Sequence, residues 1–285
     1  MPAGEGRENR MLQEMKIGFI GAGQMSEAIF SGALAAGGLL PQNITVCDIL
    51  ASRLAQMAEQ YGVNTLQTGA EGDGAHGVIA QSDVVVLAIK PQVARTFLAA
   101  LSGAAEAKTT VISIVGGFTL EALESSFPES PVLRVMPNTP MMVGRGCAGI
   151  VPGCRAGEKE IALCCQLFDL VGESVLLDEG LINAFTAVGG CGPAFAYQFI
   201  EALADGAVKQ GLPRALAVQT AARMLAGASE MVLATGQHPG QLKDSVCSPG
   251  GGTIAGVHAL EAGGFRAAVM DAVEQSCQRM DELGK

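Results

Sequence analysis

The sequence has no tryptophan, and aromatic residues make up only 4% of it. Basic residues are also scarce, since 18 Lys and Arg stand against 28 Asp and Glu and leave a net charge of −10 at pH 7. Nucleic acids and anionic membranes bind clusters of Lys and Arg, so neither is expected as a partner. The longest uninterrupted apolar run, residues 84–89, is far shorter than the roughly 20 residues of a membrane-spanning helix.

The cysteines lack the spacing of a disulfide framework or a zinc site. All eight are scattered along the chain with no C-x-x-C pair, and the three histidines show no metal-ligand spacing. We therefore expect buried free thiols and no metal.

The first residues of the chain have no apolar core of the kind found in a signal peptide. Residues 1–14 are polar and mixed in charge. We expect residues 1–15 to form a loose extension and the protein to be cytoplasmic.

Strand and helix signals alternate over residues 16–178. Hydrophobic residues make up 49% of the chain, which is enough to supply a sizeable core. The expected strands are continuously apolar, as a parallel strand covered on both faces requires. They are residues 16–20, 44–47, 84–89, 109–115 and 132–136. This order predicts an α/β, Rossmann-like, doubly wound domain over residues 16–178, with ligands at the carboxyl ends of its strands.

No strand is expected after residues 174–177. The rest of the chain has the pattern of helices separated by Gly and Pro, with helices expected at 193–210, at 213–235 and on both sides of 263–264. The helices are rich in alanine and glycine, which gives them a thin core, so burial against a second copy is expected. We place the boundary near Asp178 and expect residues 179–285 to be an all-α dimerisation and substrate domain.

A glycine-rich turn lies between the first expected strand and the first expected helix. Its sequence is Gly21-Ala22-Gly23-Gln24-Met25-Ser26. Gly21 permits a tight turn, Gly23 lets the backbone approach a pyrophosphate, and the small Ser26 allows close helix packing. The pattern also occurs in ordinary strand–helix turns, but its place after the first strand, with Asp48 ending the second, favours dinucleotide binding.

Two further turns follow apolar strands, at Lys90-Pro91 and at Gly116-Gly117. Pro91 ends its strand sharply because its ring fixes φ. Lys90 is as compatible with a solvated strand end as with a cofactor contact. Both turns fall where a dinucleotide would lie on a doubly wound sheet.

The segment 248–253, Ser-Pro-Gly-Gly-Gly-Thr, leads into an apolar helical stretch. Successive glycines can turn their N–H groups into one concavity, and the helix start adds unpaired donors, so the segment suits a small carboxylate. A flexible linker is the plainer interpretation, but Pro249 and a helix-capping Thr253 argue against it. We predict that backbone N–H groups near Ser248 and Gly252 bind a carboxylate.

Five segments, in this order over residues 16–283, together resemble pyrroline-5-carboxylate reductases: GAGQM, AIKP, MPNTP, GPA and HPGQLKDSVCSPGGGTI. The resemblance implies reduction of 1-pyrroline-5-carboxylate to L-proline, the last step of proline synthesis, with NADP(H) or NAD(H) as cofactor. It also implies a Rossmann domain and a helical domain that forms a homodimer, often within a decamer.

The resemblance also implies site residues. Its cofactor contacts fall on Gly21, Ala22, Gly23, Gln24, Met25, Ser26, Ala88, Ile89, Lys90, Pro91 and Gly116. Its substrate contacts fall on Glu179, Ser248, Gly252 and Thr253. We expect the Thr253 hydroxyl to meet the ring nitrogen as the catalytic group. Gly189 and Cys191 stand where the family has serines.

Asp48 is a second departure, because many relatives carry a neutral residue there. Its carboxylate can accept hydrogen bonds from the adenosine ribose of NADH and would repel the 2′-phosphate of NADPH. We therefore count Asp48 among the cofactor residues and expect NADH to be at least as efficient as NADPH. Arg53 lies five residues on and could offset part of this repulsion.

Two other functions are compatible with parts of the sequence. A β-hydroxyacid-type dehydrogenase also joins a Rossmann domain to a helical one, but residues 193–207 contain no lysine to protonate an alkoxide. A non-catalytic dinucleotide-binding sensor would keep the glycine turn and have no use for residues 248–253.

Overall fold

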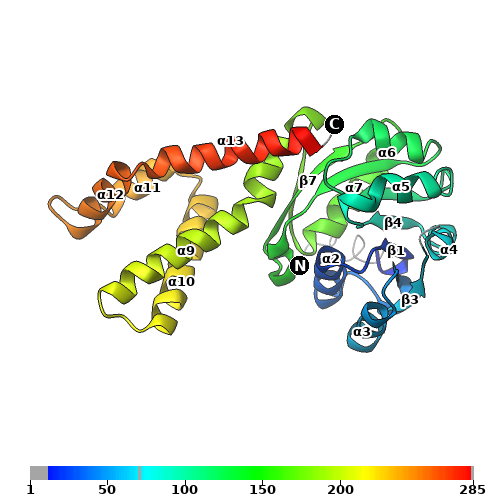
Figure 1. Ribbon diagram of the computed structural model, residues 1–285, viewed down its shortest axis with the longest axis horizontal. Coiled ribbons are helices and arrows are strands. Elements are labelled where there is room, and N and C mark those ends of the chain that lie inside the picture. Colours follow the sequence, from blue (N-terminus) through cyan, green and yellow to red (C-terminus); the bar gives the residue numbers. More distant parts are fainter. Residues whose placement is uncertain (1–11, 70–71, 284–285) are drawn as a thin grey trace. The chain divides into compact units, whose positions relative to one another are not determined.

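The computed structural model describes residues 12–69 and 72–283 (Figure 1). By their contacts these residues divide into two compact units. The first contains the chain up to Cys191 together with the residues from Cys277 onward, and the second is Gly192–Ser276. The chain therefore leaves the first unit once and returns to it at its end.

The first unit is built on an eight-stranded sheet. In their order across the sheet, the strands are β3 (Asn64–Gln67), β2 (Ile44–Asp48), β1 (Ile17–Ile20), β4 (Val84–Leu87), β5 (Thr110–Ser113), β6 (Val132–Met136), β7 (Gly146–Pro152) and β8 (Gly172–Leu176). All neighbouring pairs are parallel except β6 and β7. The strand order reverses between β1 and β4, which is where a doubly wound sheet binds its ligand. The expected fold class is confirmed.

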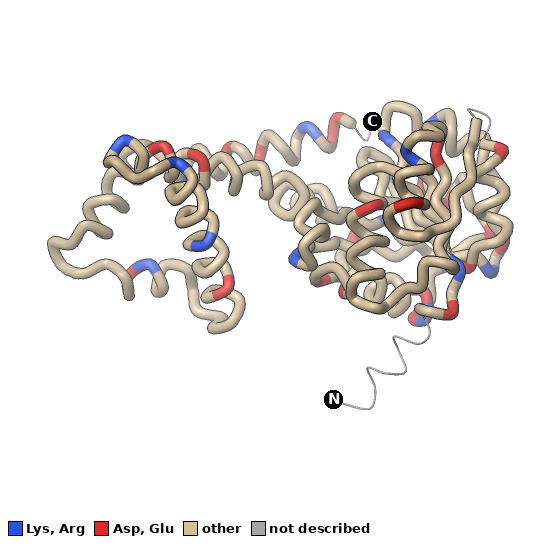
Figure 2. The backbone as a smooth tube through the Cα atoms, turned by 90° about the horizontal axis from the view of Figure 1, so that it is seen from below, with Lys and Arg blue, Asp and Glu red and all other residues tan. Residues whose placement is uncertain are grey.

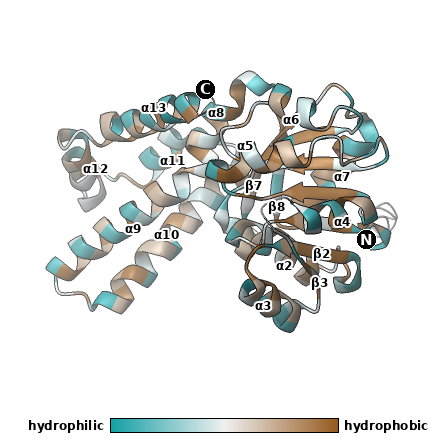
Figure 3. Cartoon of the chain, turned by 45° about the vertical axis from the view of Figure 1, so that its right-hand side comes forward, coloured by the Kyte–Doolittle hydropathy of each residue, from teal (hydrophilic) through white to brown (hydrophobic). Residues whose placement is uncertain are grey.

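Among the described residues of this unit, six α-helices connect the strands: α2 (Gln24–Ala35), α3 (Ala51–Tyr61), α4 (Asp73–Gln81), α5 (Pro91–Ala100), α6 (Leu120–Ser126) and α7 (Glu158–Asp169). Successive residues of β1 enter different cores, because side chains alternate across a strand. Phe19 packs edge-on against Phe30 of α2, with ring centroids 5.5 Å apart, whereas Ile20 belongs to a cluster with Val78 and Ile79 of α4. Both faces are covered, which explains the continuous apolar strands visible in Figure 3.

The expected loose extension differs from the structure where the chain is described. Residues 12–14 are helical, and Leu12 is 1% exposed within the larger core cluster. The side chain of Gln13 donates to the Gly37 carbonyl, and that of Asn43 donates to the Gln13 carbonyl, each at 2.6 Å. Residues 1–11 lie outside the described residues.

Residues 179–191 lie between the expected domain boundary and the contact-based one. They form η3 (Glu179–Leu181), α8 (Ile182–Phe185) and the π-helical segment η4 (Thr186–Gly190). Phe185 packs so closely on β7 that a Cβ on Gly149 would lie 2.7 Å from its ring. This contact joins the segment to the sheet, so the first unit extends to Cys191 rather than ending near Asp178.

The second unit contains α9 (Gly192–Lys209), α10 (Arg214–Thr235), α11 (Pro239–Ser245), α12 (Gly252–Ala262) and the first part of α13 (Phe265–Leu283). The expected helices are present, and α11 is an addition to them. Among the described residues of this unit, the buried ones are Ala204, Ala217 and Ala221. A core of three alanines is thin, as the small-residue pattern predicts.

Figure 2 marks the basic and acidic residues along the backbone of the second unit, and two of its arginines form ion pairs. Arg214 pairs with Asp205 at 2.6 Å, and Arg266 pairs with Glu261 at 2.6 Å. Within this part of the chain, each of these arginines therefore has its charge balanced locally.

Candidate functional site: the glycine turn and the 248–253 turn

Gly21 has a backbone conformation that only glycine adopts readily. Its φ is +106°, and its N–H donates to the Cys47 carbonyl of β2 at 2.7 Å. A Cβ at this position would lie 2.5 Å from the Ala88 carbonyl oxygen, so a side chain is excluded by contact as well as by φ. The turn therefore lies directly against the end of β4.

The amino terminus of α2 fits an anion. Gly23 is its N-cap and supplies no side chain to bond the free N–H groups of the first turn. Gly23 and Gln24 are exposed, and a Cβ on Gly23 would meet nothing within 4 Å. The Ser26 hydroxyl is buried and donates to the Gly21 carbonyl at 2.5 Å, which braces the turn from inside. These features suit the pyrophosphate of a dinucleotide.

The carboxyl ends of β1, β4, β5 and β6 meet at this turn. Ala88 donates from its N–H to the Ile20 carbonyl at 2.8 Å. A Cβ on Gly116 would lie 4.0 Å from both Pro91 and Met136, so these three residues are neighbours. Lys90 is the exposed N-cap of α5, Pro91 is the first residue of that helix, and Ile89 is half-buried. The structure thus brings the sequence-predicted cofactor residues of three strand ends together.

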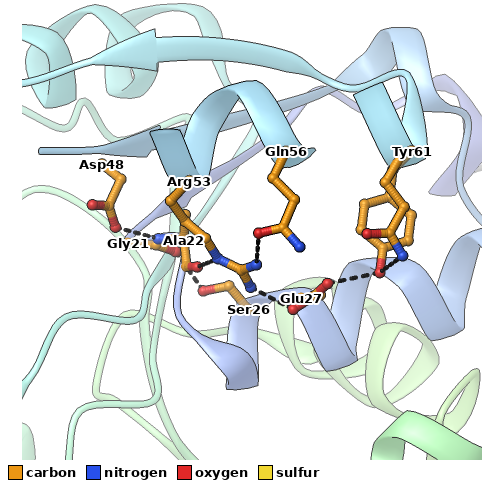
Figure 4. A network of polar contacts seen from close by, with 9 residues as sticks. Gly21, Ala22, Ser26, Glu27, Asp48, Arg53, Gln56 and Tyr61 are labelled. Atoms are coloured by element: carbon orange, nitrogen blue, oxygen red, sulfur yellow. Dashed lines mark hydrogen bonds and ion pairs between the residues drawn. The ribbon is translucent and has the colours of Figure 1, made fainter. Parts of the chain in front are cut away.

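Asp48 lies at the end of β2 with its carboxylate turned toward the glycine turn (Figure 4). Its Oδ2 accepts a 2.7 Å hydrogen bond from the Ala22 N–H, and its Oδ1 accepts a 2.9 Å hydrogen bond from the Leu50 N–H. Each oxygen keeps a lone pair for a further donor. The position and orientation suit contact with the ribose of a bound dinucleotide.

Arg53 lies beside Asp48 and joins the glycine turn to α2 (Figure 4). Its Nε donates to the Ala22 carbonyl at 2.8 Å, its Nη1 donates to Gln56 at 2.7 Å, and its Nη2 forms an ion pair with Glu27. The Tyr61 hydroxyl donates to the other Glu27 oxygen at 2.7 Å.

The same contacts govern two pKa values. Burial alone would raise the pKa of Glu27, but the hydrogen bonds from Arg53 and Tyr61 outweigh it and hold the pKa below the ordinary value. Burial, and then the neighbouring Glu27 carboxylate, raises the pKa of Tyr61. Glu27 is therefore ionised at neutral pH.

Residues 248–251 form a tight turn in the second unit. The Gly251 N–H donates to the Ser248 carbonyl at 3.0 Å, Pro249 occupies the second position, and Gly250 has φ +69° at the third. This is the sequence pattern of a type II turn. A Cβ on Gly251 would lie 2.4 Å from the Ser248 hydroxyl oxygen. The glycines here serve the turn and do not form a flexible linker.

The turn leads directly into α12. Its N-cap is Gly251, which offers no side-chain cap, so the N–H groups of the first turn remain available to an anion. The expectation that Thr253 caps this helix is wrong, since Thr253 lies inside the first turn and is exposed. Its hydroxyl therefore does not cap the helix.

Glu179 lies in the first unit and binds two groups of that unit. Its Oε1 accepts from the Leu120 N–H at 2.6 Å and from Nη1 of Arg134 at 3.0 Å. The Nε of Arg134 is buried without an acceptor among the described residues. Sequence reasoning missed Arg134, because a single arginine in an apolar strand gives no sign of its partner.

Asn138, in the MPNTP segment, connects two elements of the first unit. It is buried, its side-chain amide donates to the Gly189 carbonyl at 2.9 Å, and its Oδ1 accepts from the Cys147 N–H at 2.9 Å. Asn138 thus ties β7 to the π-helical segment. His238 is also local in its contacts, since its Nδ1 caps α11 by accepting from the Gly240 N–H at 3.0 Å.

The cysteines are free thiols; Cys47 and Cys164 are buried, whereas Cys154 is exposed. Burial raises the pKa of Cys47 to about 11. Within the described part of the chain, His, Cys, Asp and Glu form no cluster of three that could hold a metal ion. No helix among the described residues is long and apolar enough to cross a bilayer.

Two family models match the chain. Residues 179–283 match the model described as "Pyrroline-5-carboxylate reductase dimerisation". Residues 16–117 match the model described as "NADP oxidoreductase coenzyme F420-dependent". The first match begins at the boundary that the sequence suggests, whereas the compact unit ends at Cys191.

Relatives that match nearly the whole chain include pyrroline-5-carboxylate reductases. The pyrroline-5-carboxylate reductase of Methanosarcina acetivorans is 40% identical over 96% of this chain and 100% of its own. That of Arabidopsis thaliana is 42% identical over 96% of this chain and 97% of its own. Among solved structures, the NADP-bound pyrroline carboxylate reductase of Plasmodium falciparum aligns with a TM-score of 0.85 and 30% identity, covering 96% of this chain and 100% of its own.

Proposed function

The chain belongs to the pyrroline-5-carboxylate reductase family, and we propose that it reduces 1-pyrroline-5-carboxylate to L-proline by hydride transfer from NAD(P)H. This is the last step of proline biosynthesis. The observation that carries the proposal is the match to relatives of that name over nearly the full length of both chains. The two alternative functions are not favoured, because neither explains that match together with the dimerisation model over residues 179–283.

The first unit holds the cofactor in this proposal. The residues are those of the glycine turn, Gly21 to Ser26, with Asp48, and those of the neighbouring strand ends, Ala88 to Pro91 and Gly116. The open N-cap of α2 and the side-chain-free Gly23 support this assignment. When bound, the nicotinamide supplies the hydride.

The turn at residues 248–253 binds the substrate carboxylate in this proposal. The uncapped N–H groups at the start of α12, including that of Gly252, and the neighbouring Ser248 supply donors to the carboxylate. Thr253 follows in the same helical turn, and its exposed hydroxyl bonds to the ring nitrogen. Glu179, in the first unit, is the fourth substrate residue in this proposal, and its assignment rests on the resemblance to the family alone.

The proposed reaction requires no dedicated acid or base side chain. A cyclic imine nitrogen is basic enough to be protonated, and the resulting iminium accepts hydride directly at carbon. The protein then has to hold the carboxylate and the ring nitrogen, orient the reacting carbon and exclude water. Hydroxyl and amide groups suffice for this, which agrees with the residues present at the turn.

We further propose that the second unit forms a homodimer and that the dimers assemble into a decamer in the cytoplasm. The match of residues 179–283 to a dimerisation model supports the dimer. The three buried alanines of the second unit leave most of its apolar residues exposed, as expected of a surface that a partner covers. Free thiols agree with a reducing compartment.

The test is direct. The protein is mixed with NADH or NADPH and pyrroline-5-carboxylate, and loss of the reduced nicotinamide absorbance is followed while proline is measured independently. We expect equal amounts of cofactor oxidised and proline formed. A 3-hydroxyacid with NAD(P)⁺ serves as the substrate control, and turnover of that compound without proline formation would contradict the proposal.

A further inference from the structure

We propose that Glu27 sets the cofactor preference of this chain by holding the Arg53 guanidinium on the glycine turn, so that the acidic end of β2 favours NADH over NADPH. In this role Glu27 is a positioning residue that acts through Arg53. The inference rests on the proposed function only in taking a nicotinamide dinucleotide as the ligand of the site.

The location of the network places it at the adenosine end of such a ligand. Asp48 ends β2 and is bonded to the Ala22 N–H of the glycine turn at 2.7 Å. In a doubly wound fold the acidic residue after the second strand lies at the adenosine ribose. Charges in contact with Asp48 and Ala22 therefore determine whether a 2′-phosphate is tolerated there.

Arg53 is a cation beside this position, but most of its N–H donors already bond other groups of the protein. Of the five N–H donors of a guanidinium, one bonds the Ala22 carbonyl, one bonds Gln56 and one bonds Glu27. The Arg53 and Glu27 side chains are 22% and 15% exposed, so water screens this ion pair less than one on the open surface. To reach a 2′-phosphate, Arg53 would have to leave Glu27 as an unpaired, partly buried carboxylate.

Glu27 is itself fixed from the opposite side. It belongs to the first turn of α2, and the Tyr61 hydroxyl donates to its Oε1 at 2.7 Å, leaving Oε2 to the arginine (Figure 4). The carboxylate thus has one oxygen for each partner. Its lowered pKa keeps it ionised at neutral pH, so the ion pair persists under physiological conditions.

The charge balance then opposes NADPH. Asp48 and Glu27 carry two negative charges and Arg53 carries one positive charge, which leaves one negative charge beside the ribose. A phosphomonoester adds about −1.5 to −2 at pH 7. NADH brings no charge to this position, and its ribose hydroxyls can donate to Asp48. We expect NADH to bind at least about fivefold more tightly than NADPH.

The experiment is equilibrium binding of NADH and NADPH to the full chain, read by nicotinamide fluorescence and without substrate. Glu27→Gln removes the charge that holds Arg53 and keeps an acceptor for Tyr61. We expect the ratio of the two dissociation constants to shift at least about fivefold toward NADPH, with little change for NADH. We also expect NADPH binding to this variant to weaken more steeply with salt than NADH binding.

Two further variants isolate the role of Arg53. In the double variant Glu27→Gln with Arg53→Gln, the gain in NADPH binding should disappear, because the gain requires the freed guanidinium. Glu158→Gln is the matched control: it also removes a first-turn glutamate, from α7, and should leave the ratio unchanged. Retained NADH binding in each variant shows that the site is folded.

The outcomes separate this inference from the proposed function. A wild-type protein that binds NADPH more tightly than NADH overturns the inference, as does a Glu27→Gln variant with an unchanged ratio. In either case dinucleotide binding, and with it the proposed function, stands. A protein that binds neither NADH nor NADPH overturns both.

Discussion

Arg134 and Glu179 form a 3.0 Å ion pair in which the arginine side chain is 7% exposed and the glutamate side chain is 39% exposed. The buried cation depends on that one carboxylate, which also accepts the Leu120 N–H at the start of α6. Removing one partner of a buried pair is costly because the other charge stays buried.

We expect Glu179→Ala to lower the free energy of unfolding by about 1–3 kcal/mol, less than for a fully buried pair because Glu179 is half-exposed. Glu179→Gln keeps an acceptor and should lose about half as much. Urea unfolding measures both. The substrate role is tested separately through KM: a Glu179→Gln variant with wild-type KM for pyrroline-5-carboxylate would remove Glu179 from the substrate residues.

Gly21→Ala should lower the free energy of unfolding more than a glycine-to-alanine change at an open position with positive φ. At φ +106° with the Ala88 carbonyl oxygen 2.5 Å from the new Cβ, the variant suffers both strain and a clash. Gly37→Ala is the matched control, because φ is +70° there and a Cβ would meet nothing within 4 Å. We expect Gly37→Ala to lower the free energy of unfolding by about 1–2 kcal/mol. Gly21→Ala should lower it further and should also weaken NADH binding. Equal losses would mean that the close approach to β4 is unimportant.

Thr253→Ala should reduce turnover while leaving cofactor binding unchanged, since the hydroxyl is assigned to the substrate nitrogen alone. The loss of one neutral hydrogen bond, about 0.5–1.5 kcal/mol, predicts a decrease of roughly three- to tenfold in kcat/KM. Thr253→Ser restores the hydroxyl and should recover most of the activity. An alanine variant with wild-type kcat/KM would refute the assignment.

The Glu27 ion pair predicts a pH dependence of stability. The pKa of Glu27 lies below its ordinary value of 4.5 in the folded protein, so its contribution is fully present above that value and is lost as the pH falls through the folded pKa. Near neutral pH, we expect the free energy of unfolding of the wild-type protein to exceed that of Glu27→Gln by about 1–2 kcal/mol. This difference should shrink below about pH 4. Urea unfolding of both proteins across this range is the measurement, and a difference independent of pH would contradict the ion pair.

The second unit should form an interface with another copy. Light scattering of the wild-type protein at micromolar concentration should give at least twice the chain mass of 29.1 kDa. Leu233 of α10 is 71% exposed, and Leu233→Glu should shift the protein toward smaller species. Val143 is a similarly exposed apolar residue of the first unit, and Val143→Glu serves as the control. A monodisperse wild-type monomer would contradict the dimer.

The central strands could be predicted because burial on both faces leaves a continuous apolar run. Two other strands, β3 and β7, could not. All four residues of β3 are exposed, so this strand carries no hydrophobic signal and forms by hydrogen bonding to β2. The antiparallel β7 contains three small residues, at Gly146, Ala148 and Gly149, and reads as a loop by itself. Both strands are fixed by their neighbours in the sheet and not by their own composition.

The glycine turn itself could be predicted, because Gly21 between a strand and a helix suggests a tight turn, and the structure gives Gly21 a positive φ. Its close approach to Ala88 could not, because that contact depends on where β4 lies in the sheet. The side-chain network was not predictable in the same way. Glu27 and Arg53 lie 26 positions apart and meet only because β1 and β2 are adjacent. The Thr253 error has a local cause, since the tight turn places Gly251 at the N-cap and moves Thr253 into the helix.

The return of the chain to the first unit at Cys277 has a consequence for its synthesis. Asp281 accepts a 2.7 Å hydrogen bond from Asn183, and a Cβ on Gly117 would lie 3.1 Å from the Leu283 carbonyl oxygen. The ribosome completes every strand of the sheet before it adds these last residues. The turn beside Gly116 therefore gains these contacts only after residues 277–283 have been synthesised, so a chain truncated before Cys277 lacks contacts in the unit whose strands were made first.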